Sequence, residues 1–142
     1  MNRRRQKKLT ARLVTAAMCG EHTDVEALLH AGADPNTADL EGMTPLYAAS
    51  VHGATDVVRT LLEAGAAPDT ESAGVGAEGT PLCAAACWGH TGTVRELLAH
   101  GADAGLREDG GTGLTPLEWA LRGPHPETAE ALRGAAGARV TS

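Results

Sequence analysis

Residues 80–103, TPLCAAACWGHTGTVRELLAHGAD, decide the fold of this chain. Thr80 is expected to cap a helix, because its hydroxyl can accept a hydrogen bond from an amide of the first turn, and Pro81 suits the first helical position. A short apolar face follows, and Gly89 ends this helix. A second helix follows, with apolar residues at helical spacing at Val94, Leu97 and Leu98. The stretch therefore predicts a helix–turn–helix unit, which cannot bury its own apolar face and needs neighbours of the same shape.

Three other stretches of the chain repeat this pattern. Thr44-Pro45-Leu46 and Thr115-Pro116-Leu117 open two of them, and Ala11 occupies the threonine place of the remaining one. Successive copies are 33, 36 and 35 residues apart, counted from Ala11 to Thr44, to Thr80 and to Thr115. A period of this length, with T-P-L and G-A-D at fixed places, resembles the ankyrin-repeat family over about residues 9 to 133.

The resemblance implies an all-α fold, an ankyrin-repeat solenoid of helix-turn-helix units with hairpin-like loops. We expect four repeats, of which the first and last are caps, preceded by a basic arm or the start of the first helix and followed by a frayed tail. In chain order these segments are 1–8, 9–38, 39–74, 75–109, 110–133 and 134–142. The loops at 71–79 and 108–113 exceed the basic period, either as neutral insertions or as longer loops that touch a partner.

Charge is unevenly placed along the chain. Six of the twelve Lys and Arg residues lie in the first twelve positions, so the other 130 residues carry six basic and eighteen acidic side chains, a formal charge of −12. An acidic body disfavours nucleic acid as a partner. We expect the basic start to be a solvated helix or arm; the alternatives are an arm that touches phosphate or membrane, and a signal peptide. No apolar run is long enough to cross a bilayer, so no membrane partner is predicted.

Three cysteines, Cys19, Cys83 and Cys87, give no disulfide framework, because their number is odd and no C-x-x-C spacing occurs. A cytoplasmic location is therefore predicted. Cys83, Cys87 and His90 fall at i, i+4 and i+7, roughly on one helix face, and thiolate and imidazole are good zinc ligands. A metal-binding or enzymatic protein built on these three residues is one alternative, although no fourth ligand or oxyanion donor can be named. We predict no catalytic residue, no cofactor and no metal.

The residue after T-P-L departs from the family pattern. The family has a histidine there, which bonds within its turn and toward the neighbouring repeat. In this chain the four places hold Val14, Tyr47, Cys83 and Glu118. The missing network argues against high stability and not against the fold. Trp119 is expected in the core, and Arg133, at a leucine place of the earlier copies, is expected to end the array.

The resemblance also implies a binding face. In the ankyrin-repeat family, the last places of each first helix face a concave groove, and the loop tips border it. Carried over place by place, the partner-binding residues are Met18, Cys19, Val51, His52, Cys87, Trp88 and Arg122 at the helix ends, and Leu40, Glu41, Met43 and Leu114 at the tips. Trp88 is the most informative, because exposed aromatic side chains often supply much of the energy of an interface. Alternatively, Trp88 lies flat over neighbouring alanine-rich helices and only covers them.

The sequence thus predicts a non-catalytic, monomeric module that binds another protein, either as an adaptor or as an inhibitor that masks its partner. It does not identify the partner. A self-associating structural subunit is a further alternative, which sedimentation at high concentration would distinguish.

Overall fold

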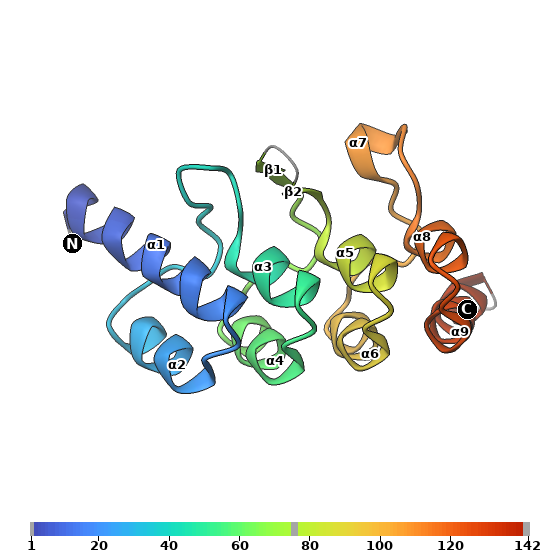
Figure 1. Cartoon of the computed structure of the whole chain (residues 1–142), viewed down its shortest axis with the longest axis horizontal. Coiled ribbons are helices and arrows are strands. Elements are labelled where there is room, and N and C mark those ends of the chain that lie inside the picture. Colours follow the sequence, from blue (N-terminus) through green and yellow to red (C-terminus); the bar gives the residue numbers. More distant parts are fainter. Residues whose placement is uncertain (1, 75–76, 141–142) are drawn as a thin grey trace.

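The computed structural model describes residues 2–74 and 77–140 and is a stack of helix pairs (Figure 1). An inner row contains α1, α3, α5 and α8, and an outer row contains α2, α4, α6 and α9. Their bounds are α1 Arg3–Met18, α2 His22–His30, α3 Pro45–Val51, α4 Thr55–Glu63, α5 Pro81–Cys87, α6 Thr91–Ala99, α8 Pro116–Arg122 and α9 Pro126–Val140. The predicted all-α solenoid of helix–turn–helix units is confirmed.

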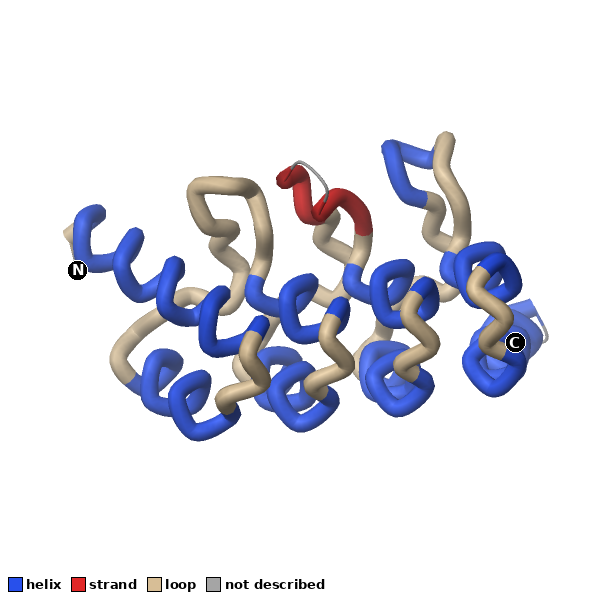
Figure 2. The backbone as a smooth tube through the Cα atoms, in the orientation of Figure 1, coloured by secondary structure: helices blue, strands red, loops and turns tan. Residues whose placement is uncertain are grey.

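Three loops, which we call fingers, project from the inner row on the side away from the outer row (Figure 2). The first finger, residues 34–43, has no regular structure. The second, residues 67–79, contains the antiparallel strands β1 (Ser72–Gly74) and β2 (Ala77–Gly79), and the third, residues 103–114, contains the short helix α7 (Glu108–Gly111). Neighbouring fingers are joined by hydrogen bonds. The N–H of Ala73 donates to the carbonyl of Gly42 at 3.1 Å, and the N–H of Asp109 donates to the carboxylate of Glu71 at 2.9 Å.

Threonine caps begin three of the inner helices, as the sequence predicts. The hydroxyls of Thr44, Thr80 and Thr115 each accept a hydrogen bond at 3.2 Å from the backbone N–H three residues further on. A proline follows each threonine at the start of the helix, where a missing N–H costs nothing. Each of these helices therefore starts at the point where a finger ends.

The two longest helices differ from expectation. α1 begins at Arg3, within the segment 1–8 that the sequence left open as a basic arm or the start of the first helix, because the side chain of Asn2 caps it by accepting a hydrogen bond from the N–H of Arg5 at 2.8 Å. α9 continues to Val140, where the sequence predicts a frayed tail over 134–142, and alanine-rich chain favours helix there. Residues 141–142 lie outside the described residues. None of the described helices is long and apolar enough to cross a membrane.

The core lies between the two rows and runs through all four repeats. Its largest fully buried members on the outer helices are Val25, Val57, Val58, Leu61, Val94, Leu97 and Leu132. Alanines such as Ala49 and Ala85, both 0% exposed, let the inner helices pack closely. Trp119 is half-buried against this core instead of fully enclosed. Arg133 is exposed, at the place where the preceding repeat has the half-buried Leu98.

Histidines in the turns between helices connect successive repeats, although the family histidine after T-P-L is missing. The Nε2–H of His90 donates to the carbonyl of Val51 in the preceding repeat at 3.0 Å, and His125 makes the same bond to Cys87. Gly53 permits this approach. Its φ of +68° is left-handed, and an added Cβ would lie 2.5 Å from Nδ1 of His90. These bonds fix how the end of one inner helix lies against the next repeat.

Candidate functional site

Trp88 is an exposed aromatic side chain at the end of an inner helix. It is the C-cap of α5, and 62% of its surface is exposed. His52 and Cys19 occupy the equivalent C-cap places of α3 and α1, and both are exposed. Because most of the Trp88 surface contacts solvent, covering the neighbouring helices accounts for only part of its side chain.

Stacking brings the ends of three inner helices into one row. We call this row the strip and define it as Val51, His52, Cys87, Trp88 and Arg122. The helices α3, α5 and α8 that carry it are neighbours in the inner row (Figure 1). The bonds from His90 to the carbonyl of Val51 and from His125 to that of Cys87 hold two of these helix ends against the following repeat. The strip therefore consists of residues that are far apart in the sequence but lie at the same ends of neighbouring helices.

The strip has mixed polarity. His52 and Arg122 are exposed, whereas Val51 and Cys87 are half-buried beside them. Met18, which is 39% exposed, and the exposed Cys19 occupy the same places in the first repeat and continue the row. An apolar centre with a polar edge is the usual composition of a protein-binding surface.

The predicted finger residues fall into two groups. Leu40 at the tip of the first finger is 89% exposed, and Glu41 beside it is exposed. Met43 and Leu114 stand at the bases of their fingers and are half-buried. Only the first pair is therefore exposed.

Leu121 is an exposed side chain that the sequence reasoning missed. It is 53% exposed and precedes Arg122 on α8. The equivalent places of the two preceding repeats hold Ser50 and Ala86, both 0% exposed because the following repeat covers them. The last repeat has no following neighbour among the described residues. The sequence did contain a signal for this exposure, because the last repeat has a leucine at a place where the preceding repeats have small residues.

The structure does not assemble Cys83, Cys87 and His90 into a metal or nucleophile site. Cys83 is buried and its Sγ–H donates to the carbonyl of Leu114 at 3.8 Å, while the His90 ring is used between repeats. Burial raises the pKa of Cys83 to about 12, and burial also raises the pKa of Cys87. Both thiols therefore resist forming the thiolate that zinc binding or nucleophilic attack needs. Among the described residues, no three His, Cys, Asp or Glu side chains are grouped so that they could hold a metal.

Glu108 anchors the third finger to the repeats below it. Its carboxylate accepts a hydrogen bond from Nε1 of Trp119 at 2.9 Å. Gly79 lies directly beneath it, with a left-handed φ of +121°, and an added Cβ there would collide with the Glu108 carboxylate. Burial raises the pKa of Glu108, although the bonds from Trp119, Cys83 and Thr80 act in the opposite direction.

We expect Glu108→Gln to change how stability depends on pH. The raised pKa means that the folded protein favours the protonated acid, so this residue's contribution to stability is fully present below the unfolded pKa of about 4.3 and is lost as pH rises through the folded pKa. The melting temperature of the wild type, relative to that of the variant, should therefore rise as pH is lowered from about 7 to about 4. Thermal melts at several pH values measure this difference. A difference that stays constant, or that changes in the opposite direction, would contradict it.

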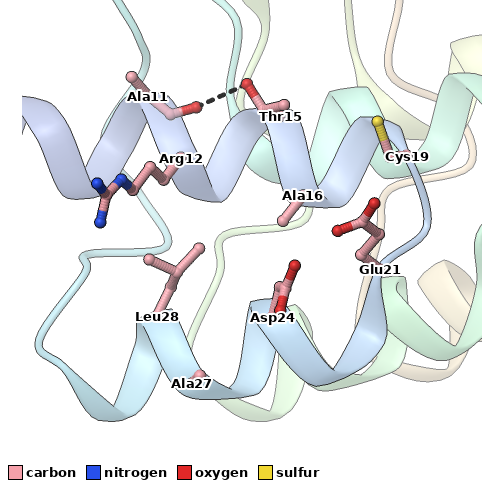
Figure 3. Close-up of a pocket in the computed structure, with 9 residues that line it drawn as sticks. All are labelled: Ala11, Arg12, Thr15, Ala16, Cys19, Glu21, Asp24, Ala27 and Leu28. Carbon is pink, nitrogen blue, oxygen red and sulfur yellow. Dashed lines mark hydrogen bonds between the residues drawn. The ribbon is translucent and has the colours of Figure 1, made fainter.

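A hollow of about 500 Å³ lies between α1 and α2 in the first repeat (Figure 3). The carboxyl groups of Glu21 and Asp24 come together on one side of it, and Arg12 lies on the other. Asp24 raises the pKa of Glu21, first through a hydrogen bond between the two side chains and second through the negative charge of the Asp24 carboxylate. The hollow shares Cys19 with the row of helix ends and is otherwise separate from the strip.

Comparisons with known proteins match the repeat pattern. A family model described as ankyrin repeats (3 copies) matches residues 1–72 and residues 67–142. Potassium channel KOR1 of Oryza sativa subsp. japonica is 39% identical over 59 residues, and Potassium channel SKOR of Arabidopsis thaliana is 32% identical over 60 residues. Each match covers 42% of this chain and 7% of the channel. The similarity to these curated relatives is thus confined to a small part of their length.

Proposed function

Because the chain belongs to the ankyrin-repeat family, we propose that it is a non-catalytic module that binds a partner protein through the strip and the tips of the fingers. Repeats of this family generally mediate binding between proteins. The binding unit would be residues 9–133, acting as an adaptor or as an inhibitor that masks its partner. The two potassium channels share too little of their length to supply a partner or an activity for this chain.

The exposure of Trp88 is the observation that carries the proposal. Large aromatic side chains near the centre of an interface contribute most of its energy, and Trp88 has strip residues on both sides, on α3 and on α8. The outer face of the stack is less suited to a partner. There the guanidinium of Arg59 already makes two bonds to the carboxylate of Glu96, at 3.1 and 3.3 Å. A partner there would compete with those bonds, whereas the strip offers the exposed ring of Trp88 between the polar His52 and Arg122.

The proposed location is the cytoplasm and the proposed state is a monomer. The described cysteines are free, and Cys19 is exposed, which suits a reducing compartment.

A photo-crosslinking experiment tests the position of the site. Benzoylphenylalanine replaces Trp88 in one variant and Arg95, exposed on α6 of the same repeat, in the matched control. After irradiation in a cell extract, we expect a covalent adduct with a second protein from position 88 and little from position 95. An adduct from position 95 alone would place the partner on the outer face. An adduct with twice the mass of the chain would favour the self-associating alternative.

A further inference from the structure

The exposed side of α1 is covered by positive charge. Six Lys and Arg side chains lie on this helix and all six are exposed, namely Arg3, Arg4, Arg5, Lys7, Lys8 and Arg12. We call these six residues the basic face. Arg4, Lys8 and Arg12 are four residues apart, so they follow one another along one side of the helix. α1 contains no acidic residue, and its buried residues lie on the side that packs against the stack.

The first turns of α1 are open to a large ligand. α1 has 16 residues and α2 has nine, and the hollow between them begins only at Ala11 of α1. No side chain from Arg3 to Lys8 is buried. Figure 1 shows this part of α1 at the outer end of the stack. A ligand can therefore reach the basic face without displacing another element of the protein.

The charges of the basic face have no partner within the protein. None of the six side chains forms an ion pair or a side-chain hydrogen bond with a residue that the structure describes, although the chain has eighteen Asp and Glu residues. The acidic side chains of this protein therefore leave the basic face available to a ligand.

The positions of these cations are also unfavourable for the helix itself. Arg3, Arg4 and Arg5 occupy its first three positions, where the helix dipole disfavours positive charge. Arg4 and Lys8 are like charges at i and i+4, which repel each other. Natural sequences break such local rules mainly at functional sites. An anionic ligand at the basic face would relieve both effects.

Carboxylates border the basic face on both sides. A groove between α1 and the first finger contains Asp34 and Asp39. The hollow between α1 and α2 contains Glu21 and Asp24 (Figure 3). An anion that wraps around α1, as the major groove of a nucleic acid duplex would, meets these carboxylates. A flat anionic surface contacts only the side of the helix that lies between them. α1 also has no aromatic residue on which single-stranded bases could stack.

We propose that the basic face docks on the negatively charged surface of a membrane. Its cations pair with the anionic head groups of the lipids. The contact stays at the membrane surface, because no large apolar side chain is exposed between Arg3 and Arg12. Clusters of about four to eight Lys and Arg residues on a helix typically attract the anionic lipids of the cytoplasmic leaflet. The inference goes beyond the strip, because it adds a second surface that would hold the protein-binding module at a membrane.

Vesicle sedimentation with the whole protein tests the proposal. One set of vesicles is pure phosphatidylcholine, and the other contains about 30% phosphatidylserine, both at about 0.15 M salt, where the Debye length is about 8 Å. We expect binding to the vesicles with phosphatidylserine and at least about tenfold weaker binding to the neutral ones. Binding should weaken further as the salt concentration is raised, since the contact is electrostatic.

Two variants with the same change in net charge locate the contact. Arg4→Glu/Lys8→Glu reverses two charges of the basic face. The matched control, Arg95→Glu/Arg133→Glu, reverses two exposed charges on the outer helices α6 and α9. We expect the first variant to lose at least about tenfold in affinity for the anionic vesicles and the control less than about threefold, because distant charges are screened.

Thermal melts separate lost binding from lost folding. Arg4→Glu places a negative charge near the start of α1, where the helix dipole favours it, so this change should keep or raise the melting temperature. A lower melting temperature would contradict the unfavourable placement of the cations, on which the proposal depends.

Three results would overturn the proposal. These are no binding to the anionic vesicles, equal binding to both kinds of vesicle, and equal losses in the two charge variants. Duplex DNA or polyglutamate that binds more tightly than the vesicles, with the same dependence on Arg4 and Lys8, would assign the basic face to nucleic acid or to an acidic protein instead. Trp88→Ala should leave vesicle binding unchanged, so failure of the basic face and failure of the strip are distinguishable.

Discussion

Replacing Leu97 with alanine is expected to lower the free energy of unfolding by about 2–5 kcal/mol, the range measured for emptied core sites. Leu97 on α6 is 0% exposed and belongs to the core that runs through the repeats. Removal of its side chain leaves a cavity in a close-packed interior and deletes contacts with the neighbouring repeats. Because each repeat is stabilised by its neighbours, the loss should weaken the repeats on both sides.

Urea denaturation followed by circular dichroism measures this loss. Leu40→Ala is the matched control, since it removes the same atoms from a side chain that is 89% exposed. The control should change the free energy of unfolding by no more than about 0.5 kcal/mol. An unchanged denaturation midpoint for Leu97→Ala would show that the repeat register is wrong at this place.

Local signals in the sequence were sufficient to predict the repeats. The caps at Thr44, Thr80 and Thr115 depend only on the residues beside them, so each marks a helix start without knowledge of the rest of the fold. Burial of Leu61 and Leu97 follows from helical spacing and the repeat period. Asn2 was the local signal that was overlooked, and its cap moves the start of α1 to Arg3.

Contacts between distant residues could not be predicted in the same way. The bond between Glu108 and Trp119 depends on how the third finger folds back, and the glycine-rich finger sequence fits several backbone conformations. The bond from His90 to Val51 requires two repeats to be stacked first, so no local pattern reports it. The family histidine, which bonds toward the neighbouring repeat, is absent from this chain. The bond from His90 to Val51 nevertheless connects two neighbouring repeats.

The candidate strip was predictable in position and not in detail. The repeat register places Val51, Cys87 and Arg122 at equivalent helix ends, so their proximity follows from stacking. Their degrees of exposure depend on the neighbours that cover them, which the period does not give. Leu121 shows this, since its place is buried in every repeat that has a following neighbour.

Replacing Trp88 with alanine is expected to weaken binding of the partner by tens of fold. Truncation of a central aromatic residue typically costs about 2 kcal/mol or more, and each 1.4 kcal/mol corresponds to a factor of ten in affinity. The fold should survive, because Trp88 is 62% exposed. Trp88 is also the C-cap of α5, and the hydrogen bonds that its backbone N–H makes there do not involve the indole. His52→Ala and Arg122→Ala, on the two flanking repeats, should cause smaller losses.

Titrations against the protein captured by crosslinking measure these affinities, with circular dichroism as the folding control. Arg95→Ala is the matched surface variant, because Arg95 is exposed on the outer helix of the same repeat and should change affinity little. A loss confined to Trp88→Ala and its flanking variants requires that the partner contacts the ends of the inner helices. Equal affinities for the wild type and Trp88→Ala would place the binding site elsewhere, because no partner can cover the centre of the strip without burying this ring.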